Sequence, residues 1–284
     1  MATITNQATL TYSGGTTNSN IATAELVETL SMTKTAVRGT YSADSDRVTY
    51  VITVNNSGTT ALTGLTLTDN LGAYTLGTST LYPLSYRTGS ILYYNNGVLQ
   101  TAPAVTAGPP LVISGITVPA GGNATIIYEA DVTNTAPLAS GSTITNTASL
   151  SGTGLTAASD TETVTAAAAP ALSINKAISP SPVVENGRVT YTFTIENRGN
   201  TAAGAADNLI ITDTFNPILS DIVVALNGTA LTSPADYTYD AATGLFSTVA
   251  GRITVPAATY TQNAATGVVT ATPGTAVLTV TGTV

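Results

Sequence analysis

The chain contains neither cysteine nor histidine among its 284 residues. Without cysteine it can form no disulfide framework and no cysteine-ligated metal site. Without histidine it lacks the commonest general base and a frequent metal ligand. The sequence also offers no clustered set of carboxylates. We therefore expect a protein that is not an enzyme and that needs no metal or cofactor.

Charged residues are scarce and mostly acidic. Only 8% of the residues are charged, and 16 acidic against 8 basic residues give a net charge of −8. This balance argues against nucleic acid and against an anionic membrane surface as partners.

Long apolar runs are missing as well. No stretch of about 18 apolar residues is present, so we expect no transmembrane helix. The start, MATITNQATLTYSGG, has neither the basic region nor the apolar core of a signal peptide, and the end, AVLTVTGTV, has no basic wall-sorting signal. We expect either that a leader is absent from this form or that the protein leaves its cell by another route. Assembly on a spore inside a mother cell that later lyses would be such a route.

The residues that are abundant favour short strands. Hydrophobic residues make up 43% of the chain, which is too apolar for disorder, and Thr, Ala, Gly and Val dominate. Stretches 48–54 and 189–195 alternate apolar and polar residues, as half-buried strands do. Three tight-turn signals lie between such stretches: Asn96-Gly97, Asn186-Gly187 and Asn227-Gly228. Together these patterns predict an all-β chain.

Two halves of the chain repeat the same landmarks in the same order. Each half has a lysine-containing strand, an Arg-Val-Thr-Tyr strand, a turn ending in glycine, a strand ending in Thr-Asp, and an Ile-Thr-Val-Pro-Ala segment. The matching stretches are 30–34 and 172–176, 47–50 and 188–191, 54–58 and 195–199, 65–69 and 209–213, and 116–120 and 253–257. The repeat predicts two tandem immunoglobulin-like β-sandwiches, residues 29–166 and 171–284, joined by a short linker.

The N-terminal segment, residues 1–28, duplicates a part of the first repeat that the second repeat lacks. Strand 124–132 matches 276–284, where the second copy ends, whereas the first copy runs on to Val164. The additional stretch, 144–164, resembles 4–26. We therefore expect residues 1–28 to supply a donor strand that completes a second sandwich.

The donor segment carries an apolar face made of Ile4, Ala8, Leu10 and Tyr12, with Asn6 on the same face. An unfinished sandwich exposes an edge and an apolar groove that accept an added strand. To reach its own second domain the segment would have to span roughly 40 Å, which a few residues at about 3.3 Å each cannot do. Insertion into a neighbouring subunit gives a head-to-tail contact that propagates into a filament. The alternative is a frayed tail or an extra edge strand on the first sandwich.

The ordered landmarks resemble a known repeat family of bacterial and archaeal surface proteins, Domain of Unknown Function 11. Its pattern is a lysine strand, V-T-Y, N-x-G, a T-D strand end and a closing I-T-N-x-A. The first copy has these at Lys34, 48–50, 56–58, Asp69 and 144–148, and the second at Lys176, 189–191, 197–199 and Asp213, with I-T-N-x-A found instead at 4–8. The resemblance implies an extracellular or surface immunoglobulin-like module and says little about a ligand.

Each sandwich is predicted to carry three polar residues on otherwise apolar strand faces. By strand parity, Lys34 shares a face with Met32, Asp69 with Leu67, and Asn146 with Ala148. The equivalent set for the second sandwich is Lys176, Asp213 and, from the neighbouring subunit, Asn6. Unpaired buried charge costs several kcal/mol, so these groups require a partner or a reaction.

A lysine, an asparagine and an acid buried together can form an intramolecular isopeptide bond. Burial disfavours the charged forms of the lysine and the acid, so a neutral amine can attack the Asn side-chain carbonyl. A protonated Asp69 or Asp213 can then shuttle protons while ammonia leaves. The arrangement resembles that of collagen-adhesin and pilin domains. The predicted cross-links are Lys34 to Asn146 within a chain and Lys176 to Asn6 between chains. The alternatives are a buried Lys–Asp ion pair bonded to Asn, or a lysine that reaches the strand end.

These observations predict a structural subunit of an extracellular filament on a cell or spore surface, with copies of itself as partner. Its only catalysis would be the single self-modifying event at each Asp. The alternative function is a monomeric surface adhesin that binds a glycan or a host protein through its loops.

Overall fold

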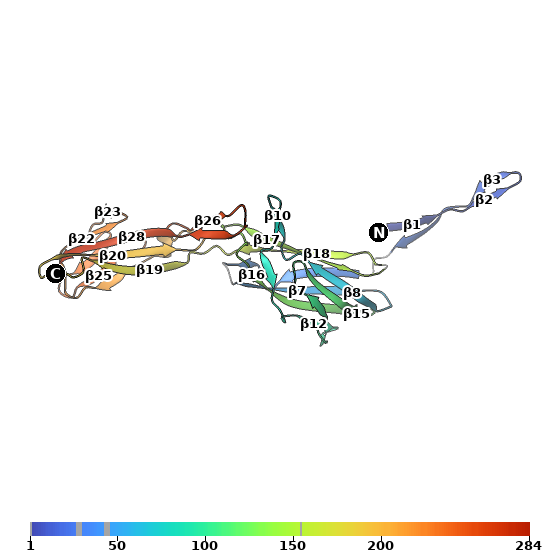
Figure 1. Cartoon of the computed structure of the whole chain (residues 1–284), viewed down its shortest axis with the longest axis horizontal. Coiled ribbons are helices and arrows are strands. Elements are labelled where there is room, and N and C mark those ends of the chain that lie inside the picture. The colour runs from blue at the N-terminus through green and yellow to red at the C-terminus, as the bar shows by residue number, and fades with distance from the viewer. Residues whose placement is uncertain (1, 27–29, 43–45, 154) are drawn as a thin grey trace.

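The computed structural model describes residues 2–26, 30–42, 46–153 and 155–284. It is an all-β protein, which confirms the predicted fold class. Figure 1 shows three parts in line: a C-terminal sandwich, a larger sandwich in the middle, and a narrow N-terminal arm that projects from the far end. Residues 27–29, which we expect to join the arm to the first sandwich, lie outside the described residues.

The first sandwich consists of two six-stranded sheets. One sheet contains β13 (Val98–Leu99), β12 (Leu92–Asn95), β16 (Asn123–Val132), β7 (Arg47–Asn56) and β5 (Leu30–Ala36) in that order, with β11 (Leu84–Tyr86) beside β16. The other contains β14 (Ala104–Thr106), β15 (Leu111–Val118), β8 (Leu62–Asp69), β17 (Thr143–Ser151), β18 (Ala158–Ala166) and β6 (Thr40–Tyr41).

Strand alternation builds the core between these sheets. In β7 every second side chain, beginning with Val48, is buried, and in β16 the buried set begins with Ala124. Facing residues of β8, β15 and β17, among them Leu67, Ile113 and Leu150, complete the core. The predicted half-buried strands thus pack as a sandwich whose apolar faces meet.

The second sandwich has a smaller sheet on one side. Its five-stranded sheet contains β19 (Leu172–Ser179), β20 (Arg188–Asn197), β28 (Gly274–Thr283), β22 (Ser220–Leu226) and β23 (Thr229–Ala230). The other sheet has only β21 (Thr212–Thr214), β25 (Leu245–Thr248) and β24 (Tyr237–Asp240), and a short 3₁₀ turn, η1 (Ala205–Asp207), precedes it. Within the described part of this sandwich, no strand takes the place that β17 and β18 have in the first.

The arm is made of strands that pair only with one another within the described residues. β1 (Ala2–Asn6) pairs with β4 (Ala22–Leu26), and β2 (Thr9–Tyr12) pairs with β3 (Gly15–Asn18) at the tip. The arm is therefore a long hairpin standing clear of both sandwiches, as Figure 1 shows. It is not an added edge strand on the first sandwich.

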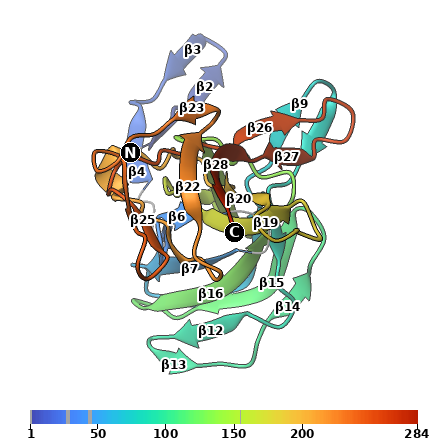
Figure 2. The ribbon, with the colours of Figure 1, turned by 90° about the vertical axis from the view of Figure 1, so that its left-hand side faces the viewer.

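Two small hairpins meet where the sandwiches join. They are β9 (Tyr74–Leu76) with β10 (Ser79–Leu81), and β26 (Thr259–Gln262) with β27 (Val269–Thr272). Figure 2 shows them side by side. Gln262 Nε2 donates to the Tyr74 hydroxyl at 2.5 Å, and the Val269 N–H donates to the Asn134 carbonyl at 2.8 Å.

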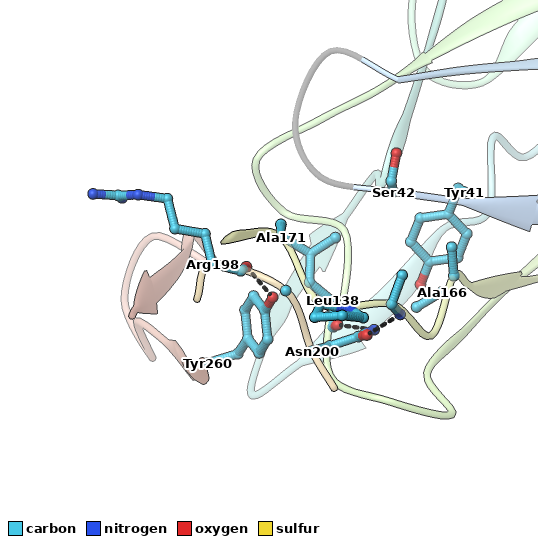
Figure 3. A pocket seen from close by; sticks show the side chains of 12 residues that line it. Tyr41, Ser42, Leu138, Ala166, Ala171, Arg198, Asn200 and Tyr260 are labelled. Carbon is cyan, nitrogen blue, oxygen red and sulfur yellow. Dashed lines mark hydrogen bonds between the residues drawn. The ribbon is translucent and has the colours of Figure 1, made fainter. Parts of the chain in front are cut away.

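The linker side of the junction is also hydrogen-bonded (Figure 3). Asn200 Nδ2 donates to the Leu138 carbonyl at 3.0 Å, and Asn200 Oδ1 accepts from the Ala169 N–H at 3.3 Å. The Tyr260 hydroxyl donates to the Arg198 carbonyl at 2.9 Å. The Asn200–Leu138 bond joins the two sandwiches, the Asn200–Ala169 bond fixes the linker, and the Tyr260–Arg198 bond lies within the second sandwich.

Two of the three predicted Asn-Gly signals form hairpin turns. Asn96-Gly97 joins β12 to β13 and Asn227-Gly228 joins β22 to β23, with positive φ at all four residues. Asn186 also has a positive φ but precedes β20 without closing a hairpin. None of the described residues forms a helix long and apolar enough to cross a membrane.

Candidate functional site

The buried polar cluster of the first sandwich takes one residue from each of three strands. Lys34 lies in the middle of β5, Asp69 ends β8, and Asn146 lies in β17. All three are buried. β5 belongs to one sheet and the other two strands to the opposite sheet, so the cluster spans the core between them.

Asp69 is the centre of the cluster. Its Oδ2 accepts from Lys34 Nζ at 2.5 Å and from the Tyr128 hydroxyl at 2.5 Å, while Oδ1 accepts from the Leu71 N–H at 2.9 Å. The acid is therefore held by a charged donor, a phenol and a backbone amide in a site without exposed surface.

Asn146 is held with a defined amide orientation. Its Nδ2 donates to the Tyr128 hydroxyl at 3.2 Å, and its Oδ1 accepts from the Gly72 N–H at 3.2 Å. The backbone donor on Oδ1 polarises the side-chain carbonyl, the group that a nucleophile would attack. Gly72 has φ +71°, and a Cβ there would lie 2.5 Å from Ile144 Cγ2, so glycine is required for this approach.

Burial sets the electrostatics of the lysine. Desolvation lowers the pKa of Lys34 below its ordinary value, against the opposing pull of the Asp69 carboxylate. The Tyr50 ring lies 4.6 Å and the Tyr128 ring 6.0 Å from Nζ, so aromatic faces line the amine. Burial also raises the pKa of Tyr128. Desolvation therefore shifts Lys34 toward the neutral, nucleophilic amine, whereas the aromatic faces and the Asp69 carboxylate favour the cation.

The equivalent residues of the second sandwich are only partly assembled in one chain. Lys176 Nζ donates to Asp213 Oδ2, and its nearest ring is Tyr191 at 4.7 Å. The Lys176 side chain is 41% exposed, whereas that of Lys34 is 0% exposed. Asn6 is exposed on the arm, away from this pair. Parity alone places Lys176 inward, but none of the described strands takes the place of β17 and covers it.

Beside Lys176 the second sandwich has an open apolar groove. A hollow of about 190 Å³ lies there, and its lining residues are Leu172, Ser173, Ile174, Ile195, Leu209, Ile210, Ile211 and Ile253. Ile174 is 57% exposed, whereas Met32 at the same place in the first repeat is 7% exposed. Every residue of β19 is exposed, although its counterpart β5 alternates buried and exposed positions.

In the first sandwich, β17 and β18 cover the corresponding groove. β17 pairs with β8, with Ala148 opposite Asp69 and Leu150 opposite Leu67. From β18, Asp160 Oδ2 accepts a hydrogen bond from the backbone N–H of Lys34 at 2.7 Å. The two strands thus close the core and bring Asn146 to the lysine.

The arm presents a strand pair of the same kind. Its apolar residues Ile4, Ala8, Leu10 and Tyr12 are all exposed. In the arm Ile4 lies opposite Ala24, just as Ile144 lies opposite Val164 in β17 and β18. β1 and β4 therefore have the pairing register of the covering strands, whereas β2 and β3 are shifted by one residue, with Leu10 opposite Thr17 where Leu150 lies opposite Ala158. Within the described residues the arm covers neither sandwich of its own chain.

Sequence reasoning missed two participants of the buried cluster, Tyr128 and Gly72. Parity within the stretch 124–132 places Tyr128 inward, but only its three-dimensional position reveals contact with both Asp69 and Asn146. The Gly72 contact arises from the turn after β8, which no periodic pattern describes.

Comparison with known proteins assigns no family to this chain. No protein-family model matches the chain, so the resemblance to Domain of Unknown Function 11 stays a prediction, and no curated protein matches it. Among solved structures, the collagen-binding domain of a Staphylococcus aureus adhesin is 14% identical, with a TM-score of 0.31, over 50% of this chain and 99% of that one. The major pilin subunit of Bacillus cereus is 11% identical (TM-score 0.34; 95% of this chain, 73% of that one). The Corynebacterium diphtheriae major pilin is 14% identical (TM-score 0.31; 93% and 62%). At these values no residue role transfers to this chain.

Proposed function

We propose that this protein is the structural subunit of an extracellular filament on a cell or spore surface, assembled head to tail through its arm. The arm of one subunit inserts into the groove of the second sandwich of the next. The observation that carries the proposal is the contrast between β19, exposed along its whole length, and its counterpart β5, in which the inward residues Met32 and Lys34 are buried. An apolar strand face left open needs a cover, and the arm has the pattern of that cover.

The first sandwich supplies the register of the proposed contact. In the first sandwich β17 pairs with β8, and residues 209–213 are the equivalent of 65–69 in β8. The same pairing between the arm and residues 209–213 places Leu10 opposite Ile211, and Ala8 opposite Asp213. Asn6 then lies at the place that Asn146 occupies, beside Lys176 and Asp213. Because the donor and acceptor surfaces lie at opposite ends of the molecule (Figure 1), the contact does not close on itself and repeats into a fibre.

A second proposal concerns covalent locking, and the buried contacts around Asp69 favour it. Lys34 and Asn146 form an isopeptide bond within the first sandwich, with Asp69 moving the protons. In the assembled fibre Lys176 and Asn6 form the same bond between subunits, with Asp213 in the role of Asp69. Each reaction happens once, so the protein is a self-modifying structural element and not a turnover enzyme.

Deleting residues 1–26 tests the filament proposal. The full chain should form fibres in electron micrographs, and the truncated chain should stay monomeric with both sandwiches folded. A synthetic peptide of residues 2–26 should bind the truncated chain one to one, and a scrambled peptide should not. Fibres from the truncated chain would refute the proposal. A folded full-length monomer without fibres would favour the adhesin alternative.

Mass spectrometry of boiled fibres tests the covalent proposal separately. Peptides that contain Lys176 and Asn6 should be joined with the loss of one ammonia, and so should those that contain Lys34 and Asn146. Fibres that dissolve fully into unlinked monomers would retain the strand exchange and eliminate the bonds.

A further inference from the structure

The Tyr128 hydroxyl bridges the acid and the amide of the buried cluster. It lies 2.5 Å from Asp69 Oδ2 and 3.2 Å from Asn146 Nδ2, the nitrogen that would leave as ammonia. Lys34 Nζ lies 2.5 Å from the same Oδ2. A continuous chain of polar atoms therefore runs from the amine through the carboxyl and the phenol to the leaving nitrogen.

The orientation of the amide is fixed on its other side. Because the Gly72 N–H donates to Asn146 Oδ1, Nδ2 must face the Tyr128 hydroxyl. The Tyr128 ring is held in turn by Tyr50, with ring centroids 5.4 Å apart and an interplanar angle of 27°. Tyr128 is thus a rigid group in contact with an atom of the proposed reaction.

We propose that Tyr128 is a catalytic residue of the isopeptide reaction, relaying a proton from Asp69 to the departing Asn146 nitrogen. The inference rests on the covalent part of the proposed function. It assigns to a residue outside the lysine, asparagine and acid trio the step in which the leaving group is protonated.

The proposed reaction forms one amide bond for the C–N bond that it breaks, and it conserves every proton. Moving the shared proton from Lys34 to Asp69 gives a neutral amine and a neutral acid, and the amine attacks Asn146 Cγ. Tyr128 gives its proton to Nδ2 while it receives the Asp69 proton, so the C–N bond breaks and ammonia leaves. The Asp69 carboxylate then takes one of the two protons on Nζ, and the other stays as the N–H of the new amide. An amide and ammonia form, Asp69 ends protonated, and Tyr128 is unchanged.

The phenol acts as a relay and not as a base. Burial raises the pKa of Tyr128, which disfavours a free tyrosinate at this position. The hydroxyl must therefore receive one proton as it gives another, and its two hydrogen-bonded neighbours make that possible.

The second sandwich differs at this position. Tyr128 lies opposite Tyr50 across β16 and β7, and the residue opposite the equivalent Tyr191 is Val280. Val280 is buried and has no group that can carry a proton. The reaction between Lys176 and Asn6 therefore lacks this relay and should be the slower of the two.

Replacing Tyr128 by Phe in the full chain tests the relay, with Tyr86→Phe as the matched control. The Tyr86 ring is buried against Tyr128, with ring centroids 6.5 Å apart, and Tyr86 is not among the hydrogen-bond partners of Asp69 and Asn146 in the described residues. The chain is made by cell-free synthesis, quenched in denaturant at intervals and digested, and ammonia loss is followed in the Lys34–Asn146 peptides. Because general acid–base groups contribute 10²–10⁴-fold, Y128F should slow the reaction by roughly 100-fold or more, while Y86F matches the parent chain.

The other results overturn the relay in distinguishable ways. Equal rates for Y128F and the parent chain, or equal slowing by Y128F and Y86F, remove Tyr128 from the reaction. Absence of ammonia loss in the parent chain removes the isopeptide reaction itself. If Y128F does not fold, the relay is tested instead by measuring the rate of ammonia loss from the parent chain in mixtures of H₂O and D₂O. Concerted transfer of two protons gives a curved dependence on the deuterium fraction, and a linear dependence refutes the relay.

Discussion

Replacing Leu10 by Asp should abolish assembly without disturbing the subunit. Leu10 is 63% exposed on the arm, so the substitution removes little packing from the isolated chain. In the proposed contact it lies opposite Ile211, at the place where the fully buried Leu150 meets Leu67 in the first sandwich. The change therefore acts on the contact between subunits.

The magnitude follows from what the contact buries. Covering the exposed part of a leucine is worth about 1–2 kcal/mol, and burying an unpaired carboxylate costs several kcal/mol more. A loss of about 4 kcal/mol or more corresponds to roughly a thousandfold weaker contact between subunits. At concentrations where the parent chain forms fibres, Leu10→Asp should sediment as a monomer.

Thr11→Asp provides the matched control. It adds the same charge one residue along the arm, but its counterpart in the first sandwich, Ser151, is exposed, so the carboxylate would point to solvent. The expected result of sedimentation over a range of concentrations is fibres for Thr11→Asp and monomers for Leu10→Asp. Fibres from both variants at the same concentration would refute the assigned face of the arm.

Three further predictions concern the first sandwich. Asn146→Ala removes the proposed cross-link, which closes a loop of roughly a hundred residues. The free energy of unfolding, measured by urea titration, should therefore fall by about 4–5 kcal/mol. An unchanged urea midpoint would mean that no bond had formed in the parent chain. Gly72→Ala should lower the free energy of unfolding by about 1–3 kcal/mol, because alanine is strained at φ +71° and its Cβ meets Ile144, and a neutral effect in the same titration would contradict the turn geometry. In the Asn146→Ala background the Lys34 amine stays free, and burial lowers its pKa below the ordinary value of 10.5. The unfolded chain then binds more protons than the folded chain, so the free energy of unfolding should rise with pH below about 10. Adding Lys34→Met should flatten that rise, and a slope that persists in the double variant would assign it to another group.

Much of the fold is predictable because strand alternation and turn chemistry are local signals. The alternation in 48–54 predicts the burial seen in β7, and Asn96-Gly97 predicts the turn that follows β12. The repeated landmarks predict two sandwiches. The hairpin β26–β27, which reaches the first sandwich through Val269 and Asn134, has no such signal, because that contact depends on how the two sandwiches meet.

In the candidate site, too, the features set by one strand are predictable and those set by the packing of the sheets are not. Parity predicts which faces carry Lys34, Asp69 and Asn146, since each strand fixes its own alternation. It cannot predict that Tyr128 joins two of them, because that contact requires the opposed sheets to be placed against each other. Parity also places Lys176 inward, yet its side chain is 41% exposed because burial also depends on a covering strand, and none of the described strands lies over it.

The most direct test of the central claim uses the absence of cysteine from the chain. Thr9 and Thr212 lie opposite each other in the proposed register, as Ser149 and Thr68 do in the first sandwich. Two single variants, Thr9→Cys and Thr212→Cys, are mixed, oxidised and separated on a non-reducing denaturing gel, with Thr11→Cys replacing Thr9→Cys as the register-shifted control. The account predicts a disulfide-linked dimer from the first mixture and little from the control. No dimer in either mixture, from chains that assemble, would contradict insertion of the arm into the neighbouring groove.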